Sequence, residues 1–407
     1  MTRSALLKSA LAALLLALAW AVLSLGMADH YAKTQPERAL FWRSQHPEAL
    51  YQSAEVAAGR GDWASARSFA ERGLKANPLD GRNLRVLAQA AAAQGKPELA
   101  LELFQNASRL APRDLPSHAW LLEHALRNRQ AEPAVRHLDA LLRLRPSLLE
   151  SLKAQAAAMA VNPATQPFMV AALGKAPPWR GAFLASLAQS QWPTQELAGF
   201  FLALSTASGL EPSEFQPWLT RLRNEKRFEQ AYVTWANLIP EAQRPYLGNV
   251  FDGGFELMPE TYVGDYAWRR RTVDYALTFW TAGRGTVGES SYMVQFEGQR
   301  SPFMDLEQSL VLPPGQWQLR WRAKANQLNS PRGLVWRVVC ENDNQALADS
   351  EPMLGHYDWR ELHMDFTVPT GCTGQGLSLL IPARIPAETQ ISGSLWLDAL
   401  TIEPRTE

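Results

Sequence analysis

The 407-residue sequence lacks an excess of either charge and has only two cysteines, Cys340 and Cys372. Its 40 basic and 40 acidic residues cancel, so no global field attracts nucleic acid, and we expect no nucleic-acid partner. The sequence also lacks HExxH and CxxC pairs, a GxSxG elbow and a phosphate-binding loop, and its seven histidines are scattered. These absences argue against the common hydrolases and nucleotide-dependent enzymes, and we expect a protein without catalytic activity.

A glycan-processing enzyme remains an alternative, because the paired carboxylates of a glycosidase form no short motif. Asp358, Glu361 and Asp365 lie close together in the sequence. The solvated face of a β-strand explains these acids better than a catalytic pair does, since any β-sandwich carries acids on its surface.

The sequence has one long apolar run, Ala10–Ala28, whose 19 residues carry no charge. This length approaches a membrane span, and the preceding Arg3 and Lys8 would keep the N-terminus in the cytoplasm. We therefore expect residues 1–30 to anchor the chain in the bacterial inner membrane as a single pass, with the bulk in the periplasm. A signal peptide cleaved after Gly26-Met27-Ala28 is the alternative, and it also places the remainder outside the cytoplasm.

A repeat of 34 residues follows a short linker at residues 31–46. The blocks 47–80, 81–114 and 115–148 align without a gap. Three kinds of residue recur at matching positions: an alanine where two antiparallel helices approach most closely, a glycine that ends the first helix in the left-handed conformation, and a proline that stops the second helix. These residues are Ala66, Ala100 and Ala134, then Gly61 and Gly95 with Arg129 in the third block, and then Pro78, Pro112 and Pro146.

This pattern resembles the tetratricopeptide repeat family over residues 47–148, although Leu50, Leu84 and His118 replace its usual aromatic residue in the first helix. The resemblance implies a stack of helical hairpins whose concave surface holds peptide segments of partner proteins. We expect an envelope protein as the partner of the repeats, and a rigid spacer is the alternative. Small first-helix residues do not suggest a charged peptide clamp; they are Ala57, Ala58, Ala90, Ala91 and Ala92.

Residues 149–245 are less regular, because seven prolines between positions 163 and 217 divide them into short segments. One further unit is visible, in which Phe228, Ala231, Tyr232 and Trp235 form an apolar stripe at helical spacing. We interpret 149–245 as degenerate repeats and a cap that close the core of the solenoid.

The pattern changes in residues 246–407, where polar and apolar residues alternate with a period of two. Turn signals separate the predicted strands, and about 160 residues of this kind predict one antiparallel β-sandwich of the jelly-roll type. Gly253 and Gly254 are expected to let the chain turn into the first strand, where Phe255 enters the core. The other predicted strands are Gln316–Ala323, Leu334–Cys340, Leu377–Ile381 and Ser394–Ile402.

Three segments of this region resemble, in the same order, segments of the jelly-roll carbohydrate-binding modules found beside glycan-active enzymes: Asn249–Glu256, Leu310–Leu319 and Gly393–Leu400. The whole chain also resembles tetratricopeptide proteins associated with bacterial exopolysaccharide production, which carry a membrane anchor, a solenoid and this kind of C-terminal domain. The resemblance implies scaffolding or glycan handling in exopolysaccharide synthesis or export, with polysaccharide as a candidate ligand. A general envelope assembly factor that binds only protein is the alternative.

The two isolated cysteines predict one disulfide, Cys340–Cys372, in an exported β-domain, with two buried free thiols as the alternative. Closing a loop of about 33 residues would stabilise the domain by about 3–4 kcal/mol.

The resemblance to carbohydrate-binding modules also implies a structural calcium ion where the first and last strands meet. Glu256 and Asp398 occupy the matching positions, and Asp252 could supply one more oxygen. Otherwise Glu256 and Asp398 cap turns or pair with arginines.

Aromatic rings near residue 265 suggest a sugar platform, because such rings stack on the apolar faces of pyranoses while arginine binds hydroxyls or carboxylates. The alternative is that some of these side chains fill the sandwich core and the rest cover loops. The residues are Tyr262, Tyr266, Trp268, Arg270 and Tyr275.

Overall fold

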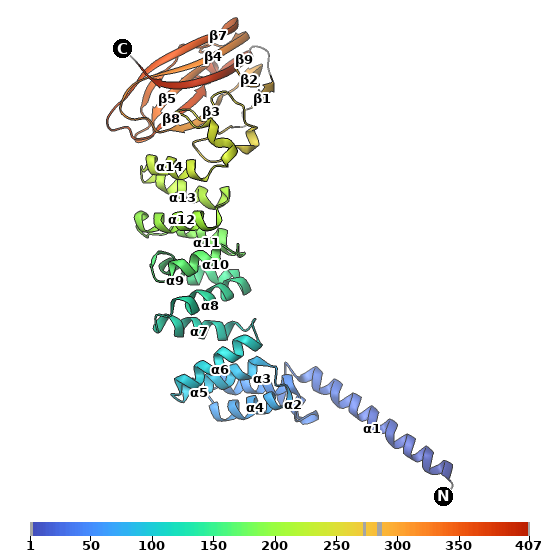
Figure 1. The fold of residues 1–407 in the computed structure, drawn as a ribbon. Helices are drawn as coiled ribbons and strands as arrows, with labels where there is room; N and C mark the ends of the chain where they lie inside the picture. The colour runs from blue at the N-terminus through green and yellow to red at the C-terminus, as the bar shows by residue number, and fades with distance from the viewer. Residues whose placement is uncertain (1–2, 272–273, 283–286, 406–407) are drawn as a thin grey trace. The chain divides into compact units, whose positions relative to one another are not determined.

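The computed structural model describes residues 3–271, 274–282 and 287–405, and its contacts divide the chain into two compact units, Met1–Arg180 and Gly181–Glu407. The first unit is helical, and the second combines short helices with two β-sheets (Figure 1). The predicted fold class is confirmed: an apolar N-terminal helix, a series of helical hairpins and an antiparallel β-sandwich.

The helices of the first unit form consecutive hairpins after the N-terminal helix α1, and the hairpins α3/α4, α5/α6 and α7/α8 coincide with the three sequence blocks. Their bounds are α1 Arg3–Tyr31, α2 Pro36–Trp42, α3 Pro47–Gly59, α4 Trp63–Ala76, α5 Gly81–Ala93, α6 Pro97–Leu110, α7 Leu115–Arg127, α8 Ala131–Leu144, η1 Pro146–Leu148, α9 Leu149–Val161 and α10 Gln166–Leu173.

The recurring residues have the roles that their positions predict. Ala66 and Ala100 are completely buried and Ala134 is nearly so, since a larger side chain there would force the two helices of a hairpin apart. Gly61 and Gly95 have φ of 76° and 71°. Arg129 takes the same left-handed conformation with φ of 52°, which is unfavourable for a residue with a Cβ atom.

The predicted linker at residues 31–46 is wrong in part, because it contains the helix α2. Pro36 begins this helix, where its missing N–H costs no hydrogen bond. Ala39 is completely buried among Ala32 of the preceding turn and Ala49 of α3. A small buried core therefore joins the end of α1 to the first repeat.

The second unit begins with four helices and continues into the sandwich. Its elements are α11 Arg180–Ala188, α12 Thr194–Ser208, α13 Pro212–Asn224, α14 Phe228–Leu238, η2 Glu241–Tyr246, η3 Pro259–Thr261, β1 Ala276–Ala282, β2 Ser290–Arg300, β3 Met304–Leu310, β4 Gly315–Asn329, β5 Val335–Cys340, β6 Ala346–Asp349, β7 Gly355–Val368, β8 Gln375–Leu380, η4 Pro386–Thr389 and β9 Gln390–Pro404.

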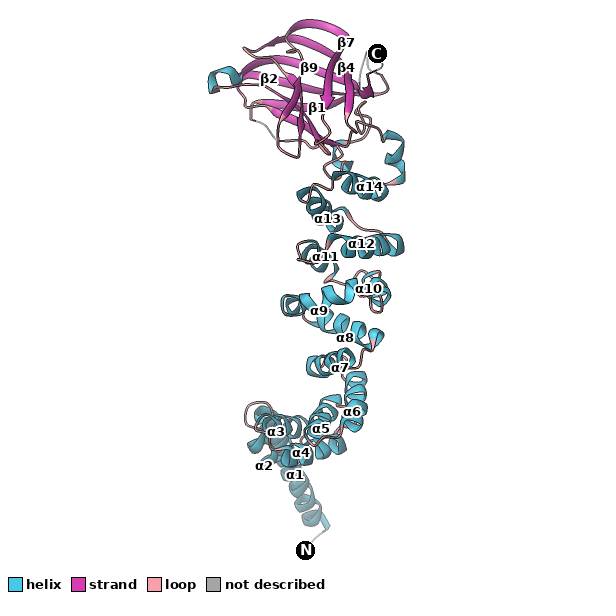
Figure 2. Ribbon diagram, turned by 90° about the vertical axis from the view of Figure 1, so that its left-hand side faces the viewer, coloured by secondary structure: helices cyan, strands magenta, loops and turns pink. Residues whose placement is uncertain are grey.

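Two antiparallel sheets pack face to face to make the sandwich. The five-stranded sheet, whose strands are labelled in Figure 2, has the order β1-β2-β9-β4-β7. The four-stranded sheet has the order β3-β8-β5-β6. The four predicted strands, two from alternation and two from more continuous apolar runs, lie within β4, β5, β8 and β9, apart from single residues at their ends. Inward-facing side chains such as Trp321, Trp336 and Leu395 fill one core between the sheets, because alternate residues of a strand point to the same face.

The helical cap and the sandwich belong to one compact unit, so the predicted boundary at residue 245 does not separate them. The Tyr266 hydroxyl donates to the carbonyl of Phe228 at 2.8 Å, and the Trp235 indole donates to the carbonyl of Val263 at 2.6 Å. Arg223 of α13 pairs with Asp265 and with Glu341 of the sandwich. The local sequence around these side chains does not predict these tertiary contacts.

The Gly253–Phe255 segment is not a strand, which corrects the prediction. Gly253 lies against β9, since a Cβ atom there would come within 1.9 Å of the Leu400 carbonyl oxygen. The Leu400 N–H donates to the Gly253 carbonyl at 2.8 Å. Phe255 is completely buried in the sandwich core, as predicted. The glycine is therefore required by a close approach of two backbones and not by a turn into a strand.

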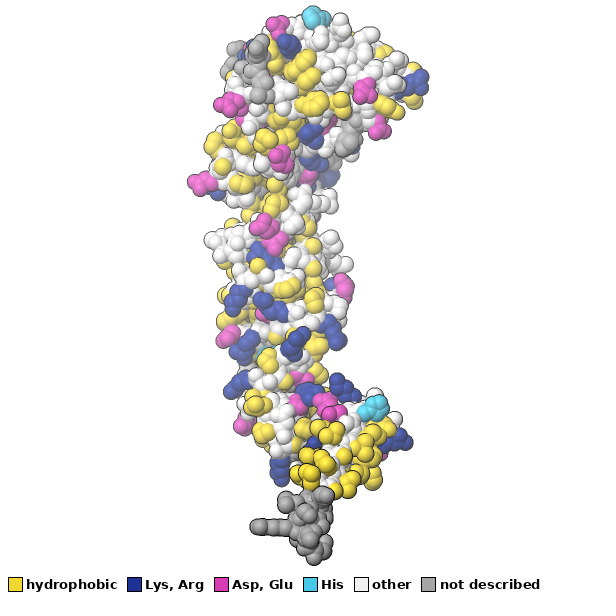
Figure 3. Space-filling model, turned by 90° about the vertical axis from the view of Figure 1, so that its right-hand side faces the viewer, with side chains coloured by type: hydrophobic (Ala, Val, Ile, Leu, Met, Phe, Trp, Pro, Cys, Tyr) yellow, Lys and Arg dark blue, Asp and Glu magenta, His cyan; other side chains and the backbone are white. Residues whose placement is uncertain are grey.

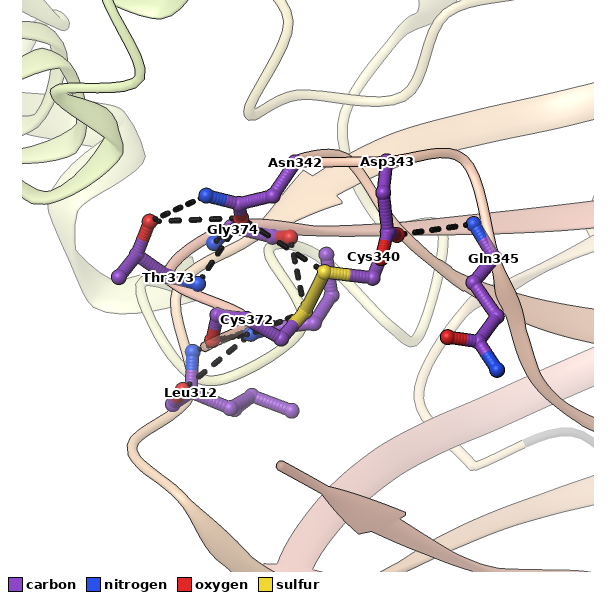
Figure 4. Close-up of a disulfide and its surroundings, with 9 residues drawn as sticks. Leu312, Cys340, Asn342, Asp343, Gln345, Cys372, Thr373 and Gly374 are labelled. Atoms are coloured by element: carbon purple, nitrogen blue, oxygen red, sulfur yellow. Dashed lines mark hydrogen bonds between the residues drawn. A yellow bond between two sulfur atoms is a disulfide. The ribbon is translucent and has the colours of Figure 1, made fainter. Parts of the chain in front are cut away.

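Cys340 and Cys372 form the predicted disulfide, with Cα atoms 5.6 Å apart (Figure 4). Both cysteines are buried in the sandwich core. The Asn342 side chain reinforces this connection, since its carbonyl oxygen accepts hydrogen bonds from the N–H groups of Thr373 and Gly374. The disulfide and Asn342 together tie the end of β5 to the start of β8.

Candidate functional site

Two members of the predicted sugar platform are buried and cannot contact a ligand, so the prediction is wrong for them. Tyr266 is 1% exposed and Trp268 is 2% exposed. Trp268 donates its indole N–H to the Asp252 carbonyl at 2.9 Å and lies in the sandwich core. Tyr266 fills the contact with the helical cap. Both rings therefore stabilise the unit instead of meeting solvent.

Two of the other predicted platform residues meet at the ring of Trp280. Tyr262 is half-buried, and its ring centre lies 6.1 Å from that of Trp280. It donates its hydroxyl to Asp252 at 2.6 Å, and burial raises the pKa of this hydroxyl. The Arg270 guanidinium stacks 4.8 Å above the same Trp280 ring. Tyr275 is 54% exposed.

A different aromatic surface lies on the solvent face of the five-stranded sheet. Phe279 of β1 is directly opposite Met293 of β2, Met293 is opposite Trp396 of β9, and Trp396 is opposite Lys324 of β4. Directly opposed residues of antiparallel strands share a face. These four residues therefore form a continuous row across four strands, which we call the transverse row.

Side chains of the transverse row are open to solvent without being fully exposed. Phe279 is 44% exposed, and Met293, Trp396 and Lys324 are half-buried. Leu277, two residues before Phe279 on the same face, is 47% exposed. An apolar strip of this kind offers flat ring faces to a ligand at little cost in side-chain entropy, because the strands already hold the rings.

Charged and polar side chains surround the transverse row. The Lys324 ammonium lies 5.9 Å from the Trp396 ring centre and 3.3 Å from Asp358 of β7. The Arg322 guanidinium lies 5.7 Å from the Trp359 ring centre. Amide side chains at Gln295 and Asn326 point to the same solvent side, where they can donate and accept hydrogen bonds.

The charges of this face compensate one another. Arg320 lies 3.6 Å from Glu361, and Arg405 lies 3.0 Å from Asp365. The Trp359 N–H and Lys324 hold the pKa of Asp358 below its ordinary value. Asp358 is therefore ionised at neutral pH, and the ion pairs leave the face with no marked excess of one sign.

Sequence reasoning missed the transverse row, although part of the signal was present. Trp396 stands between Leu395 and Leu397 in an alternating strand, so it must lie on the face opposite to theirs. Leu395 and Leu397 are completely buried, which leaves Trp396 outside. The alignment of Trp396 with Phe279, 117 positions earlier, depends on strand order and register and has no local signal.

The two carboxylates proposed to bind calcium converge on one segment. Asp398 is completely buried and accepts a hydrogen bond from the Val287 N–H at 2.6 Å. Glu256 accepts from the Glu289 N–H at 3.0 Å, two residues along the same segment. Burial and the charge of Glu256 raise the pKa of Asp398. A divalent cation at this segment would have Glu256 and Asp398 as its carboxylate ligands, and it would offset the repulsion between the two acids.

Asp252 does not join these two acids. Its carboxylate accepts hydrogen bonds from the N–H groups of Glu256 and Leu257 and from the Tyr262 hydroxyl. Among the described residues no group of three His, Cys, Asp or Glu side chains is arranged to hold a metal ion. Calcium bound by Glu256 and Asp398 would need backbone or water oxygens to complete six to eight ligands, and it would neutralise both acids.

First-helix side chains of the repeats form a paired polar network. Arg85 is 3% exposed, lies 2.8 Å from Glu55 and 3.2 Å from Asp114, and donates to the Tyr51 hydroxyl at 3.0 Å. Tyr51 and Arg85 are one repeat apart, at equivalent positions. The charged groups of this network thus pair with one another within the repeats.

The alanines of the first helices serve mainly as packing residues. Ala57, Ala90 and Ala91 are at most 8% exposed. An apolar groove of about 460 Å³ lies instead beside the α7–α8 turn and α9, where Leu126, Ala158 and Met159 contribute to its wall.

By its own elements the chain is a helical-repeat protein with a C-terminal antiparallel β-sandwich. No protein-family model matches the sequence, and no curated protein matches it. One similar solved structure is the enzymatically active domain of tailspike protein 4 of bacteriophage CBA120, at 12% identity and a TM-score of 0.28. That match covers 39% of this chain but only 21% of the tailspike chain.

Two further similarities correspond to the two kinds of structure in the chain. The β-sandwich is similar to a carbohydrate-binding module, CBM4, at 12% identity and a TM-score of 0.27, covering 39% of this chain and 99% of that one. The helical repeats are similar to Pseudomonas aeruginosa PilF at 12% identity and a TM-score of 0.26, covering 49% and 91%. Similarity at this level does not identify a ligand or a partner for this chain.

Proposed function

We propose that this chain is a membrane-anchored, non-enzymatic glycan-handling protein of the bacterial envelope, which acts in exopolysaccharide synthesis or export. Its sandwich binds glycan, and its repeats bind an envelope protein. The observation that carries the proposal is the transverse row of Phe279, Met293, Trp396 and Lys324, held open on a rigid sheet.

The chemistry of this face suits a neutral glycan. Trp396 and Phe279 offer ring faces for the apolar side of a pyranose, and Gln295 and Asn326 offer amides for its hydroxyls. Arginine and lysine on β4 are balanced by acids on β7. A polyanionic glycan would find no excess of positive charge here, so a neutral polysaccharide is the preferred ligand class.

The proposal that the protein is not an enzyme rests on the acids of the same sheet face. A glycosidase needs one carboxylic acid that stays protonated near neutral pH. The pKa of Asp358 is lowered, and Glu361 and Asp365 lie beside cations. Release of reducing ends from the bound polysaccharide would overturn this part of the proposal.

Membrane anchoring is supported by the end of α1. A helix apolar enough to cross a membrane spans Ala10–Tyr31. Ala28 is completely buried, and Asp29 accepts a hydrogen bond from His46 at 2.7 Å. Cleavage after Ala28 would remove a completely buried residue, so an uncleaved anchor is favoured over a signal peptide.

Glycan binding is tested with the full chain in detergent, on glycan arrays and by affinity electrophoresis in the exopolysaccharide of the source cell. Trp396→Ala should weaken binding by at least about tenfold, or about 1.4 kcal/mol. Trp192→Ala is the matched control, because Trp192 is also half-buried but lies between α11 and α12. Equal binding by the wild type and Trp396→Ala would refute the assignment of this face.

A protein-only assembly factor is the second candidate, and the apolar groove beside α9 supports it. In that case no glycan binds, while Leu126→Asp in the groove disturbs envelope assembly. Leu126 is 41% exposed, so this change should leave the repeats folded.

A further inference from the structure

The short helix α2 folds back along α1. Backbone hydrogen bonds from Thr34 and Gln35 to the Tyr31 carbonyl close the turn between the two helices. At the other end of α2, the Trp42 ring lies 5.8 Å from the Trp20 ring of α1. Trp20 precedes Tyr31 by about 16 Å of helix, at about 1.5 Å per residue. The end of α2 therefore lies beside the apolar part of α1.

The burial pattern of α1 shows where protein contact begins. From Ala10 to Leu23 every residue is exposed. From Ser24 onward one stripe is covered, with Ser24, Ala28 and Ala32 buried at intervals of four residues. This spacing is one face of a helix. The part of α1 that is exposed on every side thus ends near Leu23, five residues before the end of the apolar run.

This limit places the end of the fully exposed part of α1 close to Trp20. The apolar residues that are exposed without interruption are Ala10–Leu23, since Lys8 carries a charge and Ser24 begins the covered stripe. Trp20 then lies about one turn inside the boundary, in the interfacial region that Trp and Tyr prefer. Figure 3 shows the hydrophobic side chains of α1 as a dense cluster at the lower end of the molecule.

Phe41 of α2 lies at the same level and faces away from the protein. It is 84% exposed, although its neighbour Trp42 contacts Trp20 and its ring centre is 6.0 Å from that of Trp42. The opposite side of α2 is buried through Ala39. An exposed Phe beside two tryptophans is costly in water but favourable at the boundary of headgroups and acyl chains.

We propose that α2 is a membrane-contacting helix: Phe41, Trp42 and Trp20 form an aromatic collar that inserts into the leaflet nearest the repeats. The occupant of this apolar surface is lipid, because the surface is continuous with the lipid-facing part of α1. The inference rests on the proposed anchoring of α1. Beyond the anchor itself, the collar would hold the first repeat against the bilayer, so that the repeat does not project from the membrane on a flexible linker.

Depth measurement by spin labelling tests the proposal. The full chain is reconstituted into nanodiscs of phosphatidylcholine and phosphatidylglycerol, with one introduced cysteine as the label site, since Cys340 and Cys372 are bonded to each other. The label is placed at Phe41→Cys, or at Leu79→Cys as a matched control. Leu79 is 74% exposed in the turn between α4 and α5.

The label at position 41 should be several-fold more accessible to oxygen than to a water-soluble nickel complex, and the label at position 79 should show the opposite. Equal preference for the nickel complex at both sites would overturn the collar. Protection of position 41 from both reagents would also overturn it, because a protein would then cover the surface.

A third label at Leu16→Cys separates this inference from the anchor itself. Leu16 is 73% exposed in the middle of the apolar helix. Oxygen accessibility at 16 but not at 41 refutes only the collar. Water accessibility at 16, or recovery of a soluble chain that lacks α1, refutes the anchor and the collar together.

Discussion

A buried histidine pair in the third repeat should make the stability of the helical region depend on pH. The Nδ1 atoms of His118 and His137 are 3.0 Å apart, and His118 Nε2 is 3.0 Å from the Pro112 carbonyl oxygen. A carbonyl only accepts, so neutral His118 carries its proton on Nε2. Its Nδ1 must then accept a hydrogen bond from the Nδ1–H of His137. Both rings are buried.

Protonation of His137 is unfavourable in the folded state. Burial lowers the pKa of His137 from 6.5 to about 4, and the charges of His118 and Arg136 act in the same direction. The unfolded chain therefore binds a proton between pH 6.5 and about 4 that the folded chain does not bind. The stabilisation is fully present above pH 6.5 and is lost as the pH falls, by about 3 kcal/mol at the lower limit.

His137→Asn removes the titration and keeps a donor, because the Asn amide can still donate to His118 Nδ1. Urea unfolding of the full chain in detergent, followed by circular dichroism of the helices, should show the wild type losing about 3 kcal/mol more than the variant between about pH 8 and pH 4. His124→Asn is the control, since His124 lies on α7 together with His118 and is only half-buried. Parallel pH profiles for wild type and His137→Asn would refute the reasoning.

Three other outcomes are expected. Replacing Cys340 and Cys372 together by serine should lower the free energy of unfolding of the second unit by about 3–4 kcal/mol and leave the stability of the repeats unchanged. An unchanged melting temperature of the second unit would show that the disulfide does not stabilise it. Arg129→Gly should stabilise the third repeat by about 1 kcal/mol, because it removes a left-handed residue with a Cβ atom. Urea unfolding of the variant and the wild type measures this difference, and a less stable variant would contradict the prediction. Calcium at 100 times its dissociation constant should stabilise the second unit by about 2.7 kcal/mol, as measured by scanning calorimetry. Asp398→Ala should abolish this stabilisation. Equal stabilisation of the wild type and the variant would place the calcium elsewhere.

The sequence by itself determined the elements and their kind. The 34-residue period predicted the hairpins because Ala66, Gly61 and Pro78 act through local sterics and helix termination. Alternation predicted β4 and β9, because a strand with one buried face must alternate, and short apolar runs predicted β5 and β8. The disulfide was predictable because only two cysteines exist to pair.

Only the tertiary structure decided which aromatic side chains remain exposed. Tyr266 and Trp268 occur among polar residues, as a binding platform would, yet the helical cap and the sandwich core cover them. Phe279 and Trp396 are neighbours only through β2, which lies between β1 and β9 in the sheet. Likewise, α2 was predicted as a linker, and its contact with Trp20 depends on a turn that reverses the chain. Burial and strand order are set by contacts between distant residues, which local composition and periodicity do not encode.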